Sequence, residues 1–175
     1  MRAFVCIEIS EEAKKEIINI INELKNSGVI VAKYVEPQNL HLTLKFFGEI
    51  NKEEIESIKK KLDTIQVKKF EVELGKLSYF TEEFVRVLWV GIESNELKVL
   101  NEEFEKLFGK EKREFNGHIT FARVKNIKDK KKFKEFFLRL KIKPIKFFAD
   151  KIFLKKSELT PKGPIYSNIY VKELK

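Results

Sequence analysis

Residues 40–49, LHLTLKFFGE, and residues 117–126, GHITFARVKN, contain the two histidines of this 175-residue chain. Each stretch alternates a histidine and a threonine with large apolar residues, as His41-Leu42-Thr43-Leu44 and His118-Ile119-Thr120-Phe121. Strict alternation predicts a half-buried strand whose polar pair shares one face while the apolar pair faces a core. We therefore expect two equivalent strands, each presenting an imidazole and a hydroxyl on the same side.

The first half of the chain reads as alternating strands and helices. We expect a strand over Ala3–Ile9, a helix from the N-cap Ser10 to Ser27-Gly28, a loop at Pro37–Asn39, the histidine strand Leu40–Phe47 ended by Gly48, a helix from the N-cap Asn51 to Leu62 with Glu54 completing a capping box, and a strand over Phe70–Leu77.

The second half repeats this order. We expect a strand over Val85–Ile92, a helix over Asn95–Phe108 ended by Gly109, the second histidine strand Gly117–Val124, a helix over Lys128–Leu140, a strand over Lys146–Leu154, a turn at Thr160–Pro164 and a last strand over Ile165–Val171.

The repeated order predicts an internal duplication. Asn39 and Asn116 each stand two places before a histidine, and Lys45 and Arg123 follow it at a similar distance. We expect one domain over residues 1–175, made of approximate repeats 1–80 and 84–175. The predicted fold is α+β and bilobal: two lobes related by a pseudo-twofold axis, each with an antiparallel sheet and outer helices, and an active-site cleft between them. The alternative is two unrelated strands in one sheet.

Composition bounds the class of protein. Hydrophobic residues make up 43% of the chain, with sixteen Phe, which is ample for a packed core. The net charge of +9 favours a polyanionic partner, although many lysines belong to mixed-sign helix faces. The Lys- and Glu-rich composition is thermophile-like. The single Cys6 excludes a disulfide framework, and no signal peptide or membrane-spanning run is visible, so we expect a cytoplasmic protein. We also expect it to be a monomer.

A pair of histidines suits acid–base catalysis. Imidazole has an ordinary pKa of about 6.5, so one ring can act as base while the other acts as acid. In-line cleavage of a phosphodiester needs a base at the incoming oxygen and an acid at the leaving oxygen, on opposite sides of phosphorus. Thr43 and Thr120 are placed to hydrogen-bond the phosphate, and Arg123 or Lys45 to neutralise its charge. The residues alone leave open which histidine is the acid.

Metal and cofactor chemistry are disfavoured. Two histidines with no metal-ligand spacing are too few for an ordinary catalytic zinc site, and no glycine-rich phosphate loop is present. We expect neither metal nor cofactor.

The paired His-x-Thr-x (HxTx) phrases resemble the two-histidine phosphoesterase superfamily, in particular its RNA 2′,3′-cyclic phosphodiesterase branch, historically called 2′-5′ RNA ligases. The resemblance extends to Arg2–Val5, Trp89–Gly91 and the stretch from Ser157 to Tyr166. Gly117 and Tyr34 depart from the family pattern, where proline and tryptophan are usual.

The resemblance implies metal-independent hydrolysis of a terminal 2′,3′-cyclic phosphate to a 2′-phosphate. It implies that His41 is the proton donor to the leaving 3′ oxygen, that His118 is the proton acceptor from water, and that Thr43, Thr120 and Arg123 hold the phosphate. The expected substrate is RNA with a 2′,3′-cyclic phosphate or a small cyclic nucleotide. The alternatives are 2′-5′ joining of tRNA halves and a non-catalytic RNA-binding module.

Lys45, Phe46 and Phe47 each fit two roles. Lys45 shares the histidine face on strict alternation, but it suits a surface ion pair equally. Phe46 and Phe47 can stack on a nucleobase or pack in the core, and Phe47 is the candidate for substrate binding. Trp89 is expected in the core and Tyr166 as a turn anchor.

Overall fold

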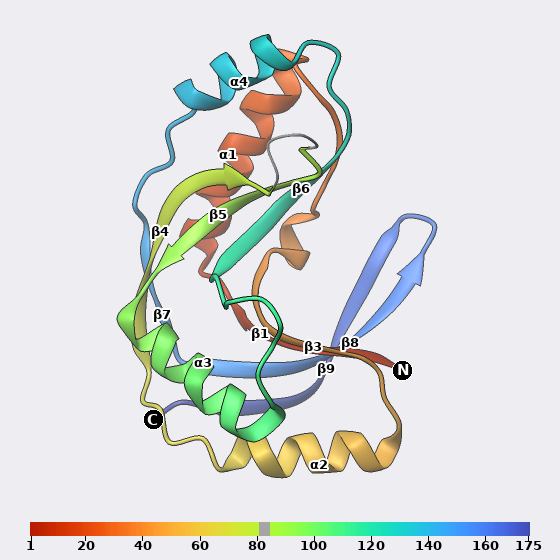
Figure 1. Ribbon diagram of the computed structural model, residues 1–175, viewed down its shortest axis with the longest axis vertical. Coiled ribbons are helices and arrows are strands. Elements are labelled where there is room, and N and C mark those ends of the chain that lie inside the picture. Colours follow the sequence, from red (N-terminus) through yellow and green to blue (C-terminus); the bar gives the residue numbers. More distant parts are fainter. Residues whose placement is uncertain (81–84) are drawn as a thin grey trace.

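The computed structural model describes residues 1–80 and 85–175, which form nine strands, four α-helices and one short 3-10 helix (Figure 1). In chain order the elements are β1 Arg2–Glu8, α1 Glu11–Ser27, β2 Val31–Tyr34, η1 Pro37–Asn39, β3 His41–Glu49, α2 Lys52–Asp63, β4 Phe70–Tyr79, β5 Val87–Glu93, α3 Asn95–Phe108, β6 His118–Asn126, α4 Lys130–Arg139, β7 Lys146–Ala149, β8 Lys151–Thr160 and β9 Gly163–Glu173.

The described strands form two antiparallel sheets. Sheet A has the order β3-β1-β8-β9, and sheet B has the order β2-β6-β5-β4-β7. The two sheets occupy opposite ends of an elongated molecule, with sheet B at the top of Figure 1 and sheet A below it. The predicted α+β, bilobal fold is therefore confirmed.

The two histidine strands have equivalent neighbours. β3 pairs with β1, and β6 pairs with β5, so that His41 lies opposite Glu8 while His118 lies opposite Gly91. β1 pairs on its other side with β8, and β5 pairs with β4. Thus β4, from the first half of the chain, lies in sheet B, and β8, from the second half, lies in sheet A. The lobes therefore do not coincide with the sequence halves, and residue 84, the predicted start of the second repeat, lies outside the described residues.

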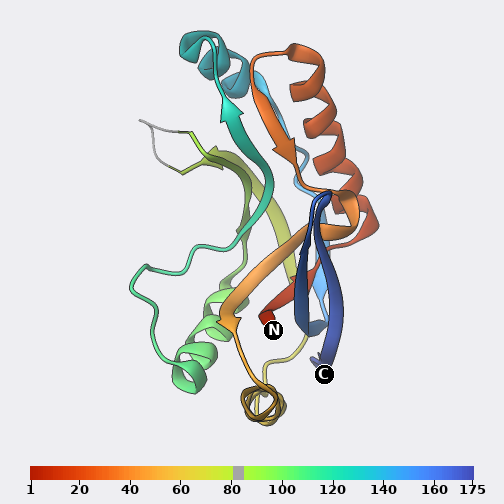
Figure 2. The ribbon, with the colours of Figure 1, turned by 90° about the vertical axis from the view of Figure 1, so that its right-hand side faces the viewer.

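Helices cover the side of each sheet that faces away from the histidines. α1 contacts β6, and α4 packs against β4, where the ring of Tyr79 lies 5.5 Å from that of Phe137. α2 contacts β9, and the end of α3 packs against β3, where the rings of Phe47 and Phe108 lie 5.1 Å apart. Figure 2 shows α1 along the outside of the upper lobe and α2 below the lower one.

The alternating apolar residues of both histidine strands enter the core. Leu42 and Ile119 have no exposed surface, and Leu44 and Phe121 are also buried. Burying a side chain of this size contributes about 1.5–3 kcal/mol. The core therefore fixes which face of each strand carries the histidine and the threonine.

The predicted helix ends are largely confirmed. Ser10 accepts a hydrogen bond from the backbone N–H of Ala13, and Gly28 ends α1 in the left-handed conformation. Asn51 and Glu54 form the predicted capping box. α4 begins at Lys130, two residues later than predicted, because Asp129 is its N-cap.

Two strand predictions were wrong, and one strand was missed. Gly48 does not end β3, because its φ of +71° is accommodated at an irregular pairing and the strand continues to Glu49. The predicted strand Lys146–Leu154 is two strands, β7 and β8, which lie in different sheets and are separated by Asp150. β2 was not predicted, since its four residues carry little periodic signal.

We expect Asn51→Ala to lower the free energy of unfolding by about 1 kcal/mol, because it removes the oxygen that accepts from the Glu54 N–H at 2.9 Å. Urea denaturation measures this change. Asn51→Asp, which keeps an acceptor, is the matched control and should remain close to the parent. An equal loss in both variants would contradict the capping role.

Candidate active site

Each histidine strand contains an irregularity directly after its threonine. In β3, Thr43 pairs with Cys6 and Lys45 with Val5, which leaves Leu44 without an opposite residue. In β6, Thr120 pairs with Trp89 and Ala122 with Leu88, which leaves Phe121 without one. Such a bulge shifts the alternation of side chains by one residue.

The bulge decides which residue follows the threonine on the same face. In β6 that residue is Arg123, so His118, Thr120 and Arg123 lie in one row. In β3 the equivalent residue is Phe46, which pairs with Phe4 and is 65% exposed. We call the sheet face that carries each row the histidine face.

His41 is held on two sides by hydrogen bonds and on two others by aromatic rings. Its Nδ1–H donates to the carbonyl oxygen of Asn39 at 2.6 Å, and its Nε2 lies 2.9 Å from the Thr43 hydroxyl. The rings of Phe4 and Tyr166 lie 5.0 and 5.5 Å away. The imidazole orientation is therefore fixed, with Nε2 as the atom that can exchange a proton.

His118 is held in the same manner. Its Nδ1–H donates to the carbonyl oxygen of Asn116 at 2.7 Å. The rings of Phe80 and Trp89 lie 5.1 and 5.5 Å from the imidazole, and these two rings stack on each other. Both histidines thus share one tautomer, set by a backbone carbonyl two residues earlier. Asn39 and Asn116 orient the imidazoles through their backbone carbonyls.

The two histidine faces interact electrostatically. Burial lowers the pKa of His41 below its ordinary 6.5, and the charges of Lys155 and His118 lower it further, while the Asn39 carbonyl opposes the shift. Burial also raises the pKa of Tyr166 in sheet A, and the charge of Arg123 in sheet B opposes this shift. Both pairs join residues of different sheets, and β3 and β6 contact one another directly, so the two rows lie near one another.

Lys45 and Phe47 lie apart from these rows. Lys45 pairs across the strands with the core residue Val5, and its ammonium binds the carboxylate of Glu111. Phe47 packs against Phe108 of α3. Strict alternation places Lys45 beside the histidine, and the bulge at Leu44 breaks that alternation.

Three side chains around His41 were not predicted as site residues. Lys155, on β8, donates to Glu8 at 2.7 Å and has only 12% of its side chain exposed. Glu8 lies directly opposite His41. Tyr166, expected as a turn anchor, instead contacts the His41 ring edge-to-face. Only the resemblance around Tyr166 contained any signal for these positions.

The two surface hollows that the described residues form away from the histidines are not part of the site. Two surface hollows of about 640 and 630 Å³ lie around Asp63 and Tyr170 and around Phe70 and Phe148, and neither is lined by a histidine. Within residues 1–80 and 85–175, no group of three or more His, Cys, Asp and Glu side chains is placed to hold a metal ion. Within the same ranges, no helix has the length and apolar character needed to cross a membrane.

Known sequences resemble the chain over its full length. It is 37% identical to the RNA 2′,3′-cyclic phosphodiesterase of Methanocaldococcus jannaschii, over 97% of this chain and 98% of that protein. It is 32% identical to the protein of the same name from Methanothermobacter thermautotrophicus, over 99% of both chains.

Solved structures share the fold. The crystal structure of TT0787 of Thermus thermophilus superposes with a TM-score of 0.80 at 26% identity, covering 99% of this chain and 98% of that one. Escherichia coli LigT complexed with 3′-AMP superposes with a TM-score of 0.77 at 20% identity, covering 99% and 96%. The profile of the LigT like Phosphoesterase family matches twice, over residues 7–89 and 90–166. The chain therefore belongs to the LigT-like phosphoesterase family.

Proposed function

We propose that this phosphoesterase hydrolyses the 2′,3′-cyclic phosphate at an RNA 3′ end to a 2′-phosphomonoester, without a metal ion. The names of its full-length relatives support the substrate class. The observation that carries the mechanism is the shared tautomer: each Nδ1–H donates to a backbone carbonyl, which leaves Nε2 of His41 and of His118 as the reacting atoms.

The reaction is an in-line displacement at phosphorus. Nε2 of His118 accepts a proton from the attacking water, whose oxygen forms the new bond to phosphorus. The bond from phosphorus to the 3′ oxygen breaks, and Nε2–H of His41 protonates that oxygen. The assignment of acid and base follows the family resemblance, and proton transfer by each ring is worth about 100- to 10,000-fold in rate.

Substrate binding favours the protonated form of His41, which takes its proton from the solvent. Burial lowers the pKa of His41 and so favours its neutral form in the free protein, because the charged imidazolium is poorly solvated there. A phosphodiester anion beside the ring favours the charged form and so raises its pKa. His41 therefore becomes an acid when the substrate anion is present.

Neutral and cationic donors would hold the phosphate. The Thr43 hydroxyl, 2.9 Å from Nε2 of His41, can turn toward a non-bridging oxygen, and Thr120 holds the equivalent place in β6. Arg123 lies in the same row as Thr120 and adds a guanidinium. We assign no substrate contact to Lys45 or Phe47, whose partners are Glu111 and Phe108.

We expect turnover of a 2′,3′-cyclic nucleotide to persist in EDTA, since the two imidazoles supply both the base and the acid that the displacement needs. His118→Ala should lower kcat by about 100- to 10,000-fold while product affinity changes little. Asn51→Ala, which lies outside the site, is the control. Turnover abolished by EDTA would contradict the metal-free mechanism, binding without turnover in the parent would favour an RNA-binding module, and joining of tRNA halves would favour the ligase.

We expect NMR titration of the free protein to place the pKa of His41 below 6.5, and added inorganic phosphate to raise it. Lys155→Met should raise this pKa, because it removes a neighbouring cation, and Glu8→Gln should lower it, because it removes an anion. A His41 pKa that is insensitive to both substitutions and to phosphate would contradict the proposed electrostatics.

A further inference from the structure

Two cations lie directly opposite each other on sheet B. Lys33 of β2 pairs with Arg123 of β6, so both side chains leave the sheet on the histidine face, and both are exposed. Like charges in directly opposed positions destabilise a sheet. Among the residues that the structure describes, neither cation forms an ion pair. An anion bound between them would offset this repulsion.

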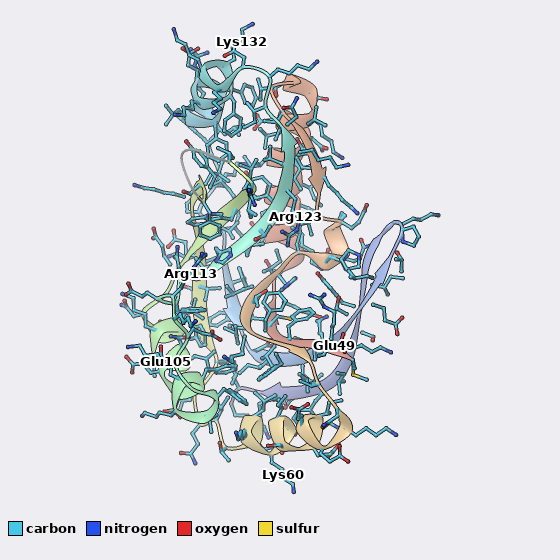
Figure 3. All side chains as sticks on the ribbon, turned by 45° about the vertical axis from the view of Figure 1, so that its right-hand side comes forward. Glu49, Lys60, Glu105, Arg113, Arg123 and Lys132 are labelled. Atoms are coloured by element: carbon cyan, nitrogen blue, oxygen red, sulfur yellow. The ribbon has the colours of Figure 1, made fainter. Side chains whose placement is uncertain are left out.

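Lys33 extends from sheet B to the His41 side of the site. The Lys33 ammonium reaches the turn between β8 and β9, since its Nζ is 3.6 Å from where a Cβ on Gly163 would stand. The side-chain amide of Asn39 donates to the carbonyl of Pro164 in this turn at 3.0 Å, and Tyr166 follows it. Tyr166 contacts His41 and senses the charge of Arg123. Figure 3 labels Arg123 on β6, midway along the molecule.

The stereochemistry of the reaction places the rest of the RNA on the same side. Water attacks opposite the 3′ oxygen, so the ribose lies on the side of the leaving oxygen. With His41 as the acid, the ribose and its 5′ substituent therefore lie on the His41 side. In an RNA end that substituent is a phosphodiester to the preceding nucleotide, whereas in a mononucleoside 2′,3′-cyclic phosphate it is a hydroxyl.

We propose that Lys33, beside Arg123, binds the phosphodiester 5′ to the terminal nucleotide, and that this contact makes the enzyme prefer an RNA end to a mononucleotide. The proposal rests on the proposed function and extends it from the reacting phosphate to the neighbouring one. Lys33 is a specificity-determining residue in this account, because its ammonium touches a part of the substrate that does not react.

Steady-state kinetics on two substrates test this. The probes are a diribonucleotide ending in a 2′,3′-cyclic phosphate and the corresponding mononucleoside 2′,3′-cyclic phosphate. Lys33→Met should lower kcat/KM for the dinucleotide by about 5- to 30-fold, mainly through KM, and by a several-fold smaller factor for the mononucleotide. The dinucleotide reaction should also lose salt dependence, with a slope change of about 0.7 per lost phosphate contact.

Two controls isolate the contact. Lys60→Met makes the same charge change on α2, far from Arg123 in Figure 3, and should affect neither substrate. A dinucleotide with an uncharged methylphosphonate linkage should erase the difference between the parent and Lys33→Met. Equal losses on both substrates, or no loss on either, would overturn the proposal.

Binding keeps the two proposals distinguishable. If the parent turned over neither substrate, the proposed function would fail. Affinities for a dinucleotide 2′-phosphate and a mononucleoside 2′-phosphate would then decide the role of Lys33. Weaker binding of the dinucleotide alone in Lys33→Met supports the phosphodiester contact, and equal binding by parent and variant refutes it.

Discussion

Both imidazoles are oriented by the same short interaction, a hydrogen bond from Nδ1–H to the backbone carbonyl two residues earlier in the chain. The acceptor is main chain, so the orientation depends on the course of the strand entering each motif and not on a second side chain. The aromatic rings of Phe4 and Tyr166 on one side, and of Phe80 and Trp89 on the other, restrict the remaining motion. A reaction that needs two opposed proton-transfer groups depends on this constraint.

The exchange of β4 and β8 between the two sheets explains how one chain builds two matched halves around a site. β4 of the first half completes sheet B, and β8 of the second half completes sheet A, so each histidine strand is supported by both halves. The exchange also brings side chains from the end of the chain to His41. Lys155 on β8 and Tyr166 on β9 belong to the same sheet as His41 although they are far from it in sequence.

The sequence predicted what depends on local pattern. Alternation around His41 and His118 predicted their strands and the buried Leu42 and Ile119, and side-chain oxygens at Ser10 and Asn51 predicted two helix starts. It did not predict the bulges, because an unpaired residue depends on the register of the partner strand. Lys45 was therefore placed with the histidines, and Phe46 was not identified as the counterpart of Arg123.

Long-range contacts were also beyond local pattern. The polar pair Asp150-Lys151 shifts the apolar alternation by one residue but does not show that the flanking strands lie in different sheets, and the partner of Lys155 is a glutamate at the other end of the chain. Neither the change of sheet nor the distant partner can be predicted from a window of ten residues. The family resemblance compensated in part, since it drew attention to the stretch that ends at Tyr166.

The most direct test of the central claim is a crystal structure with a nucleoside vanadate, whose five-coordinate vanadium mimics the in-line transition state. We expect the two apical oxygens to lie within hydrogen-bond distance of Nε2 of His41 and Nε2 of His118, one oxygen to each ring, with both Nδ1–carbonyl hydrogen bonds intact. Vanadate bound elsewhere, or contacting only one imidazole, would contradict it.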